Sequence, residues 1–152
     1  MFVGREKELN ILNNQFKSNK FEFTVIYGRR RVGKTAIINE FIKDKKAIYF
    51  TGVESNAKQN LQNLSQSILS FEQGMPIESE FSSFQAALDF VFQKSLRERI
   101  VLVIDEYPYV AKSSNSLASI LQLLIDRYKD QSKLFLILCG SSMSYMEDHV
   151  LA

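Results

Sequence analysis

The sequence predicts a doubly wound α/β fold, in which helices cover both faces of a mostly parallel sheet to give three layers. Two observations support this prediction. Stretches with strand composition alternate with stretches of helical periodicity along the 152 residues, which is the order of a parallel sheet with crossover helices. Two of the strand stretches, 100–104 and 134–139, are continuous apolar runs, as expected of parallel strands buried on both faces.

The bulk properties predict a single domain. The chain is 45% hydrophobic and 24% charged, which is enough to bury one core. The chain contains no run of about eighteen apolar residues, the length needed to span a bilayer, and no signal peptide is recognisable. We therefore expect a cytoplasmic protein without a membrane partner. Cys139 is the only cysteine, which excludes an internal disulfide and favours a buried core role. The net charge of +2 does not by itself indicate nucleic acid.

The first third of the chain is predicted to alternate between helix and strand. Apolar residues recur at helical spacing over 6–16, which predicts an amphipathic helix. Residues 21–27 are rich in aromatic and β-branched side chains and run into a glycine, which predicts a strand entering a turn. Apolar pairs four residues apart over 37–42 predict the next helix. A second short strand is expected over 47–51.

The rest of the chain continues the alternation. Apolar spacing over 61–71 predicts a helix that stops at the glycine and proline following it. Ser82 and Gln85 form a predicted capping box for another helix, which leads into the apolar strand 100–104. Residues 117–128 again have helical periodicity and precede the last apolar strand. All predicted strands therefore end at one edge of the sheet, where ligands bind in such folds.

A phosphate-binding loop lies between the first strand and the helix that follows it. The motif GxxxxGK[ST] comprises Gly28, Arg29, Arg30, Arg31, Val32, Gly33, Lys34 and Thr35. Its backbone N–H groups surround phosphates, Lys34 is expected to reach the β- and γ-phosphates, and the Thr35 hydroxyl is expected to ligate magnesium. Ala36, at the start of the helix, is added to the binding residues. The strand, loop and helix order is the context that the motif requires, so Mg²⁺ and ATP are the predicted ligands.

The three arginines in the variable positions of the loop have two interpretations. Arg29, Arg30 and Arg31 could attract a triphosphate electrostatically. A solvated loop tip, paired with carboxylates from elsewhere in the protein, explains the same residues and is preferred. ATP is preferred over GTP because no Asn-Lys-x-Asp guanine motif occurs.

Two carboxylates follow the apolar strand 100–104. Asp105 is expected to position magnesium through its water shell. Glu106 beside it is suited to polarise a water for in-line attack on the γ-phosphate, as a general base. A charged pair that merely ends a strand is the alternative, and the phosphate loop in the same chain favours the catalytic interpretation.

Two serines follow the last predicted strand. A hydroxyl there could sense the γ-phosphate or orient the attacking water, and Ser141 is preferred to Ser142 for this role. Turn-forming serines account for the same residues, so both interpretations stay open.

Four segments together resemble the prokaryotic archaeal-type ATPases of the AAA-like branch of P-loop ATPases. They are Phe2-Val3-Gly4-Arg5-Glu6, the phosphate loop, Asp105-Glu106-Tyr107 and Gly140-Ser141-Ser142. The resemblance covers essentially the whole chain. It implies that the strand ending at Cys139 inserts between the phosphate-loop strand and the Asp105 strand. It also makes Val3, Gly4 and Arg5 candidates for contacts with the adenine.

The family resemblance implies further parts that residues 1–152 do not contain. Relatives continue with a fifth strand, a helical lid, a second sensor arginine and carboxyl-terminal domains. We therefore expect a partial ATPase core that turns ATP over slowly alone. A homo-oligomer is a further possible partner, and nucleic acid would be bound through those carboxyl-terminal domains.

The leading interpretation is an ATPase that hydrolyses Mg-ATP to drive a conformational change in other domains. A nucleotide-dependent switch or scaffold with little turnover is the alternative. A phosphotransferase is disfavoured because no acceptor-binding feature stands out.

Overall fold

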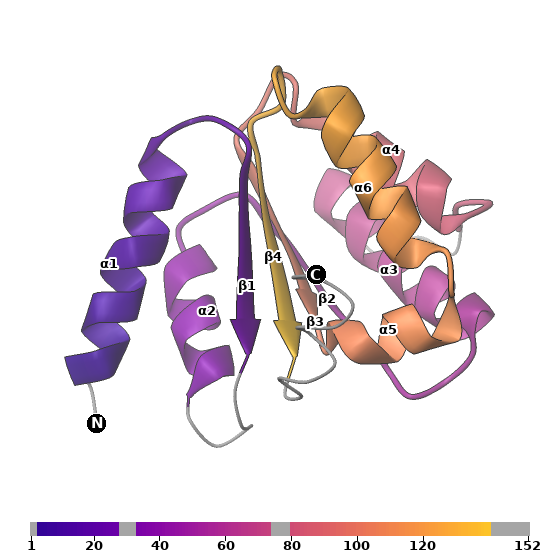
Figure 1. The fold of residues 1–152 in the computed structure, drawn as a ribbon, viewed down its shortest axis with the longest axis horizontal. Helices are drawn as coiled ribbons and strands as arrows, with labels where there is room; N and C mark the ends of the chain where they lie inside the picture. Colours follow the sequence, from indigo (N-terminus) through magenta and orange to yellow (C-terminus); the bar gives the residue numbers. More distant parts are fainter. Residues whose placement is uncertain (1–2, 28–32, 74–79, 141–152) are drawn as a thin grey trace.

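A computed structural model describes residues 3–27, 33–73 and 80–140 of the chain (Figure 1). Helices and strands alternate along it. The elements are α1 (Val3–Lys17), β1 (Glu22–Tyr27), α2 (Lys34–Ile42), β2 (Ala47–Thr51), α3 (Ala57–Gln73), α4 (Phe84–Lys94), β3 (Ile100–Asp105), α5 (Tyr107–Ser113), α6 (Leu117–Tyr128) and β4 (Leu134–Gly140). The predicted doubly wound α/β fold is confirmed.

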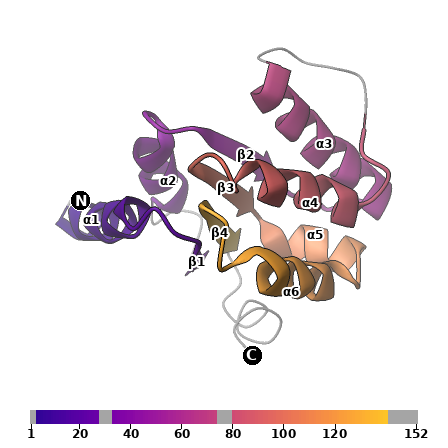
Figure 2. The same ribbon diagram turned by 90° about the horizontal axis from the view of Figure 1, so that it is seen from above.

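The four strands form one parallel sheet in the order β1-β4-β3-β2. The strand ending at Gly140 therefore lies between β1 and β3, as the family resemblance implies. Figure 2 shows the sheet between two helical layers, with α1 and α2 on one face and the remaining helices on the other. Every residue of β3 and β4 is buried, which confirms the prediction from their apolar runs.

Alternate residues of the central strands face two separate cores. On one face α1 and α2 pack on Val101, Val103 and Ile137. On the other, helices α3 to α6 cover side chains such as Leu102 and Leu136. This alternation is what the two-residue period of a strand imposes, and it holds the strand ends in a fixed relation to the helices that begin there.

The Arg99 side chain anchors the end of α1 to the sheet. Its guanidinium donates to the carbonyl oxygens of Gln15 (2.9 Å), Phe16 (3.1 Å), Lys133 (2.7 Å) and Lys20. Two of these acceptors are carbonyls in the last turn of α1, which have no partner within the helix. The same guanidinium lies over the Phe16 ring, 5.0 Å from its centroid.

Two local expectations need correction, and one segment cannot be compared. The cap of α4 is Ser83 and not Ser82: the Ser83 backbone is extended, and its hydroxyl accepts from the Ala86 N–H at 3.0 Å. Helix α5 is not predicted by the periodicity because it has only seven residues. The expected terminal helix beyond Ser144 lies outside the described residues. No helix in the described ranges is long and apolar enough to cross a lipid bilayer.

Candidate functional site

The described residues of the three sequence motifs lie at one edge of the sheet. Because β1, β3 and β4 are parallel, their carboxyl ends lie together (Figure 1). The pairing register places Tyr27 beside Gly140, and β3 ends at Asp105 next to them. Residues 28–32 of the loop, and Ser141 with Ser142, lie outside the described residues. For Val3, Gly4 and Arg5 only the helical backbone is described.

The amino terminus of α2 points at the same edge. Gly33 precedes the helix with a φ of 85°, a left-handed backbone that glycine adopts without steric cost. Gly33 offers no side chain to cap the first turn, so the backbone N–H groups at this end are left for another acceptor, such as the phosphate that helix amino termini commonly bind. Thr35 and Ala36 follow it and are exposed.

Lys34 and Asp105 meet across the junction of α2 and β3. The Lys34 Nζ lies 3.5 Å from the Asp105 Oδ1, and the two residues are 4% and 7% exposed. A buried ammonium requires a counter-ion because desolvation penalises an isolated charge. The contact brings together the two motifs that the sequence predicts to hold phosphate and magnesium.

Two further groups bind the Asp105 carboxylate. The backbone N–H of Glu106 donates to Oδ1 at 2.9 Å, and the Tyr49 hydroxyl donates to Oδ2 at 2.6 Å. Burial raises the pKa of Tyr49, the hydrogen bond to Asp105 acts in the same direction, and an interaction with the Thr35 side chain opposes them. The phenol is therefore a proton donor at neutral pH. The sequence motifs do not indicate Tyr49.

Glu106 occupies a strained position immediately after β3. Its φ of 51° and ψ of 44° are left-handed, which costs about 1–2 kcal/mol for a residue with a Cβ. The break ends the strand and starts α5, since the Tyr109 N–H donates to the Glu106 carbonyl at 3.1 Å. The Glu106 side chain is partly exposed at the sheet edge, beside Asp105.

Gly52 packs the end of β2 against the segment that carries Glu106. Its N–H donates to the Asp105 carbonyl at 2.8 Å. A Cβ at this position would lie 2.4 Å from Val110 Cγ2 and 2.7 Å from the Glu106 carbonyl oxygen, so only glycine fits without a shift. A glycine directly after a predicted strand is the one sequence signal for this contact.

Asn60 fixes the loop after β2 to α3 and α5. This fully buried side chain accepts from the Val53 N–H at 2.9 Å and donates to the Val53 carbonyl at 3.1 Å. It also donates to the Ser113 hydroxyl at 3.2 Å. Hydrogen bonds from the segment after β2 and from α3 thus hold the backbone around Asp105 and Glu106 in place. The sequence motifs do not indicate Asn60.

Cys139 is fully buried in β4, as predicted. Burial raises the pKa of its thiol, and the Asp105 carboxylate adds to the effect. The side chain therefore packs as a small apolar group, without nucleophilic character.

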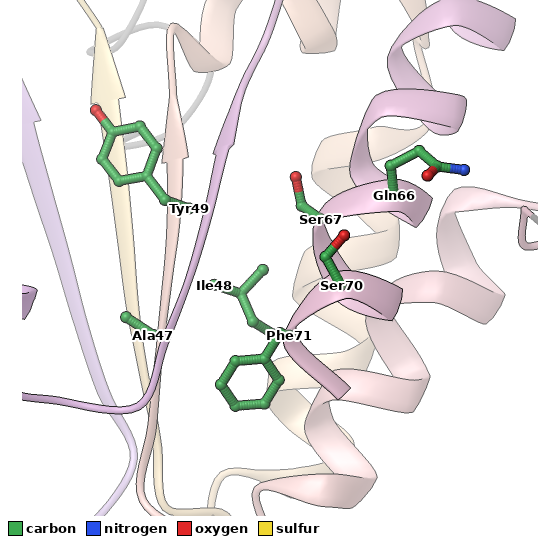
Figure 3. Close-up of a pocket in the computed structure, with 7 residues that line it drawn as sticks. All are labelled: Ala47, Ile48, Tyr49, Gln66, Ser67, Ser70 and Phe71. Carbon is green, nitrogen blue, oxygen red and sulfur yellow. The ribbon is translucent and has the colours of Figure 1, made fainter. Parts of the chain in front are cut away.

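A shallow pocket lies between β2 and α3. Its volume is about 440 Å³, and it is lined by Ala47, Ile48, Tyr49, Gln66, Ser67, Ser70 and Phe71. Figure 3 shows that Ile48 and Tyr49 point to opposite sides of the strand. The Tyr49 ring extends toward the carboxyl ends of the strands, where its hydroxyl binds Asp105. The residue also contributes to the lining of the pocket.

Comparison with known proteins identifies the family of this chain. A family model described as the ATPase domain predominantly from Archaea matches residues 2–151. The chain is 36% identical over its whole length to an uncharacterized protein of Methanocaldococcus jannaschii, of which it spans 32%.

Solved structures share the fold. The Walker-type ATPase of Pyrococcus abyssi matches with a TM-score of 0.68 and 19% identity over 99% of this chain and 48% of that one. The ORC2 protein of Aeropyrum pernix, in ADPNP-ADP complexes, matches with a TM-score of 0.67 and 18% identity over 97% of this chain and 44% of that one. The chain thus spans about a third of the curated relative and under half of these structures.

Proposed function

The chain belongs to the family of ATPase domains found predominantly in Archaea, and we propose that it binds ATP with magnesium and hydrolyses the terminal phosphate. ATP binding is what the family implies. The proposal of hydrolysis rests on one observation: Glu106, a carboxylate able to accept a proton, stands at the carboxyl edge of the sheet directly after Asp105.

The chemistry of the donor groups fits a magnesium nucleotide. Thr35 supplies a hydroxyl and Asp105 a carboxylate, the hard oxygen donors that magnesium prefers alongside phosphates. Lys34 is a buried cation at a helix amino terminus, which suits a phosphate anion. Magnesium bound there would neutralise charge that develops on the phosphate oxygens. Lys34 would hold the β- and γ-phosphates, while Thr35 and Asp105 would hold the metal and its water shell.

Glu106 is proposed as the general base. A carboxylate that accepts a proton from water must stand within hydrogen-bonding reach of the attacking oxygen. Glu106 follows Asp105 directly, and its left-handed backbone takes the chain out of the strand at this point. Ser141 is proposed to sense the γ-phosphate from the end of β4, and residues 28–32 are proposed to surround the phosphates.

The consequence of hydrolysis is proposed to be a conformational change in the longer protein. Glu106 immediately precedes α5. At the other end of α5, the Ser113 hydroxyl accepts a hydrogen bond from the Asn60 side chain on α3. A movement at the γ-phosphate would therefore be passed to two helices on one face of the sheet. Self-association and DNA binding are proposals for the whole protein, and salt-dependent DNA binding by that protein tests the second one.

A Glu106→Gln substitution tests the base assignment. In the whole protein, ATP affinity should stay within about threefold, and single-turnover hydrolysis should fall at least about 100-fold, because general-base catalysis contributes about 10²–10⁴. Glu40→Gln, an exposed glutamate on α2, is the matched control and should leave both quantities unchanged. Hydrolysis at the normal rate in Glu106→Gln would reject Glu106 as the base.

A nucleotide-dependent switch with little turnover is the second candidate. The direct Lys34–Asp105 contact favours it, because phosphate and magnesium would each compete with this ion pair. The ratio of hydrolysis rate to nucleotide exchange rate separates the two. A switch releases most of its ATP unhydrolysed, whereas an ATPase releases ADP.

A further inference from the structure

Tyr49 connects the outer strand of the sheet to the proposed magnesium site. It lies on β2, and the register pairs Thr51, two residues further along, with Asp105. Residues two apart on a strand face the same side and are separated by about 6.6 Å. The phenol is long enough to cover that separation, and its hydroxyl reaches the Asp105 Oδ2 at 2.6 Å.

The Asp105 carboxylate is held at both oxygens. Oδ1 receives the Glu106 N–H at 2.9 Å and faces the Lys34 ammonium at 3.5 Å. Oδ2 receives the Tyr49 hydroxyl. A carboxylate with a donor on each oxygen has one orientation, and a 2.6 Å bond from a phenol to a carboxylate is in the range of strong, charge-assisted hydrogen bonds.

The Asp105 carboxylate is one of the two groups to which the proposed function assigns magnesium, and Tyr49 binds it from β2. A group that holds a metal-directing carboxylate from outside the metal shell sets the orientation in which that carboxylate meets the metal. Such outer groups typically change metal affinity about 10- to 100-fold when removed.

We propose that Tyr49 is a positioning residue for the magnesium site, fixing the orientation of the Asp105 carboxylate. The inference rests on the proposed function and extends it to a residue outside the sequence motifs. The hydroxyl, and not the aromatic ring, carries the role, because the ring is only partly buried at the edge strand while the hydroxyl makes the contact with Asp105.

A matched pair of substitutions isolates this hydroxyl. Tyr49→Phe removes it and leaves the ring. Tyr128→Phe is the control, because the Tyr128 hydroxyl donates to the Asp89 Oδ1 at the same 2.6 Å but between α6 and α4, within the helical layer on the opposite face of the sheet from α2. Both variants lose one phenol–carboxylate hydrogen bond, so a general loss of stability affects them alike.

Two affinities are measured for each protein, with ADPNP as the nucleotide. The first is ADPNP affinity in EDTA, and the second is the affinity of the ADPNP complex for Mn²⁺, followed by electron paramagnetic resonance. In Tyr49→Phe we expect Mn²⁺ affinity to fall about tenfold and ADPNP affinity in EDTA to stay within about twofold. In Tyr128→Phe both affinities should stay within about twofold.

Combining Tyr49→Phe with Asp105→Asn tests whether Tyr49 acts through the Asp105 carboxylate. If Tyr49 acts through Asp105, adding Tyr49→Phe to Asp105→Asn weakens Mn²⁺ binding no further, as double-mutant cycles show for groups that act together. Mn²⁺ affinity in Tyr49→Phe equal to that of the unsubstituted chain, or full additivity with Asp105→Asn, overturns the inference alone. Failure of the unsubstituted chain to bind ADPNP and Mn²⁺ overturns the proposed function and this inference with it.

Discussion

The Lys34 ammonium and the Asp105 carboxylate face each other at 3.5 Å from two different elements, α2 and β3. Among the described residues, each charge provides the other with an oppositely charged neighbour at this buried position. Removing one of them leaves the other desolvated without this neighbour, which costs more than the pair contributes.

This pair predicts non-additive stabilities. Lys34→Met should lower the free energy of unfolding by about 1–3 kcal/mol, because Asp105 stays buried. Combining it with Asp105→Asn should cost at least about 1 kcal/mol less than the sum of the single changes. Urea unfolding without nucleotide measures all three variants. Lys43→Met, which removes an exposed lysine at the carboxyl end of the same helix, paired only with the exposed Glu40 among the described residues, should leave the free energy of unfolding almost unchanged, because an exposed ion pair contributes little. Strict additivity at 34 and 105 would show that the contact carries no coupling.

The left-handed backbone of Glu106 predicts an inverted preference between glycine and alanine. Both substitutions remove the side chain, but glycine tolerates a φ of 51° whereas alanine retains the Cβ clash. Glu106→Gly should therefore be more stable than Glu106→Ala by about 1 kcal/mol, while neither hydrolyses ATP. At Gln122, in the exposed middle of α6, alanine should be the more stable by about 1 kcal/mol. Chemical unfolding of the four variants gives the comparison, and equal preference at both sites would contradict it.

The carbonyl contacts of Arg99 predict a large effect far from the nucleotide. Arg99→Met should destabilise the fold by about 2–4 kcal/mol, since charged hydrogen bonds contribute about 1.5–3 kcal/mol each and are not additive. Amide hydrogen exchange should accelerate first in α1, whose last carbonyls lose the guanidinium and keep, among the described residues, only the backbone N–H groups of Ser18 and Asn19 as donors. Arg97→Met, at an exposed neighbouring position, should change stability by less than about 0.5 kcal/mol. Unaltered exchange in α1 would disprove this anchor.

The raised pKa of Cys139 predicts a loss of stability in alkali. The thiol titrates near 9.0 in the unfolded chain, whereas burial keeps it protonated in the fold, so above pH 9 the folded state holds more protons than the unfolded state. The free energy of unfolding should be flat from pH 7 to 8.5 and then fall by up to about 1.4 kcal/mol per pH unit for this group. Cys139→Ala should remove the part of the decline that begins near pH 9. An identical slope in that variant would assign the decline elsewhere.

Much of the fold follows from periodicity, and the exceptions are short or local. The apolar runs of β3 and β4 are visible because both faces of each strand are buried. Helix α5 is too short for a periodic signal, although Pro108 in its first turn is a typical helix start. The α4 cap differs by one residue because adjacent serines offer the same chemistry, and only backbone geometry selects Ser83. Periodicity cannot give the order of the strands in the sheet. That order is implied by the family resemblance, and the structure has it.

The site divides in the same way. Lys34, Asp105 and Glu106 lie in sequence motifs that predict a site for one ligand, so the sequence indicates them. Tyr49 acts through a hydrogen bond to a residue 56 positions away, and Gly52 through a close approach to Val110. Contacts of this kind depend on how strands align, and no local pattern encodes them.

The order of the strands also determines when the described sheet can form during synthesis. Strand β4 leaves the ribosome after the other three described strands, yet it lies between β1 and β3. Residues 22–27 must wait for residues 134–140 before they gain the pairing that the register gives them, and such non-local pairing is slow. The loop that we propose for nucleotide follows β1 directly. A nascent chain therefore exposes β1 to chaperones and proteases until β4 inserts beside it, and we expect nucleotide to stabilise the fold only after that step.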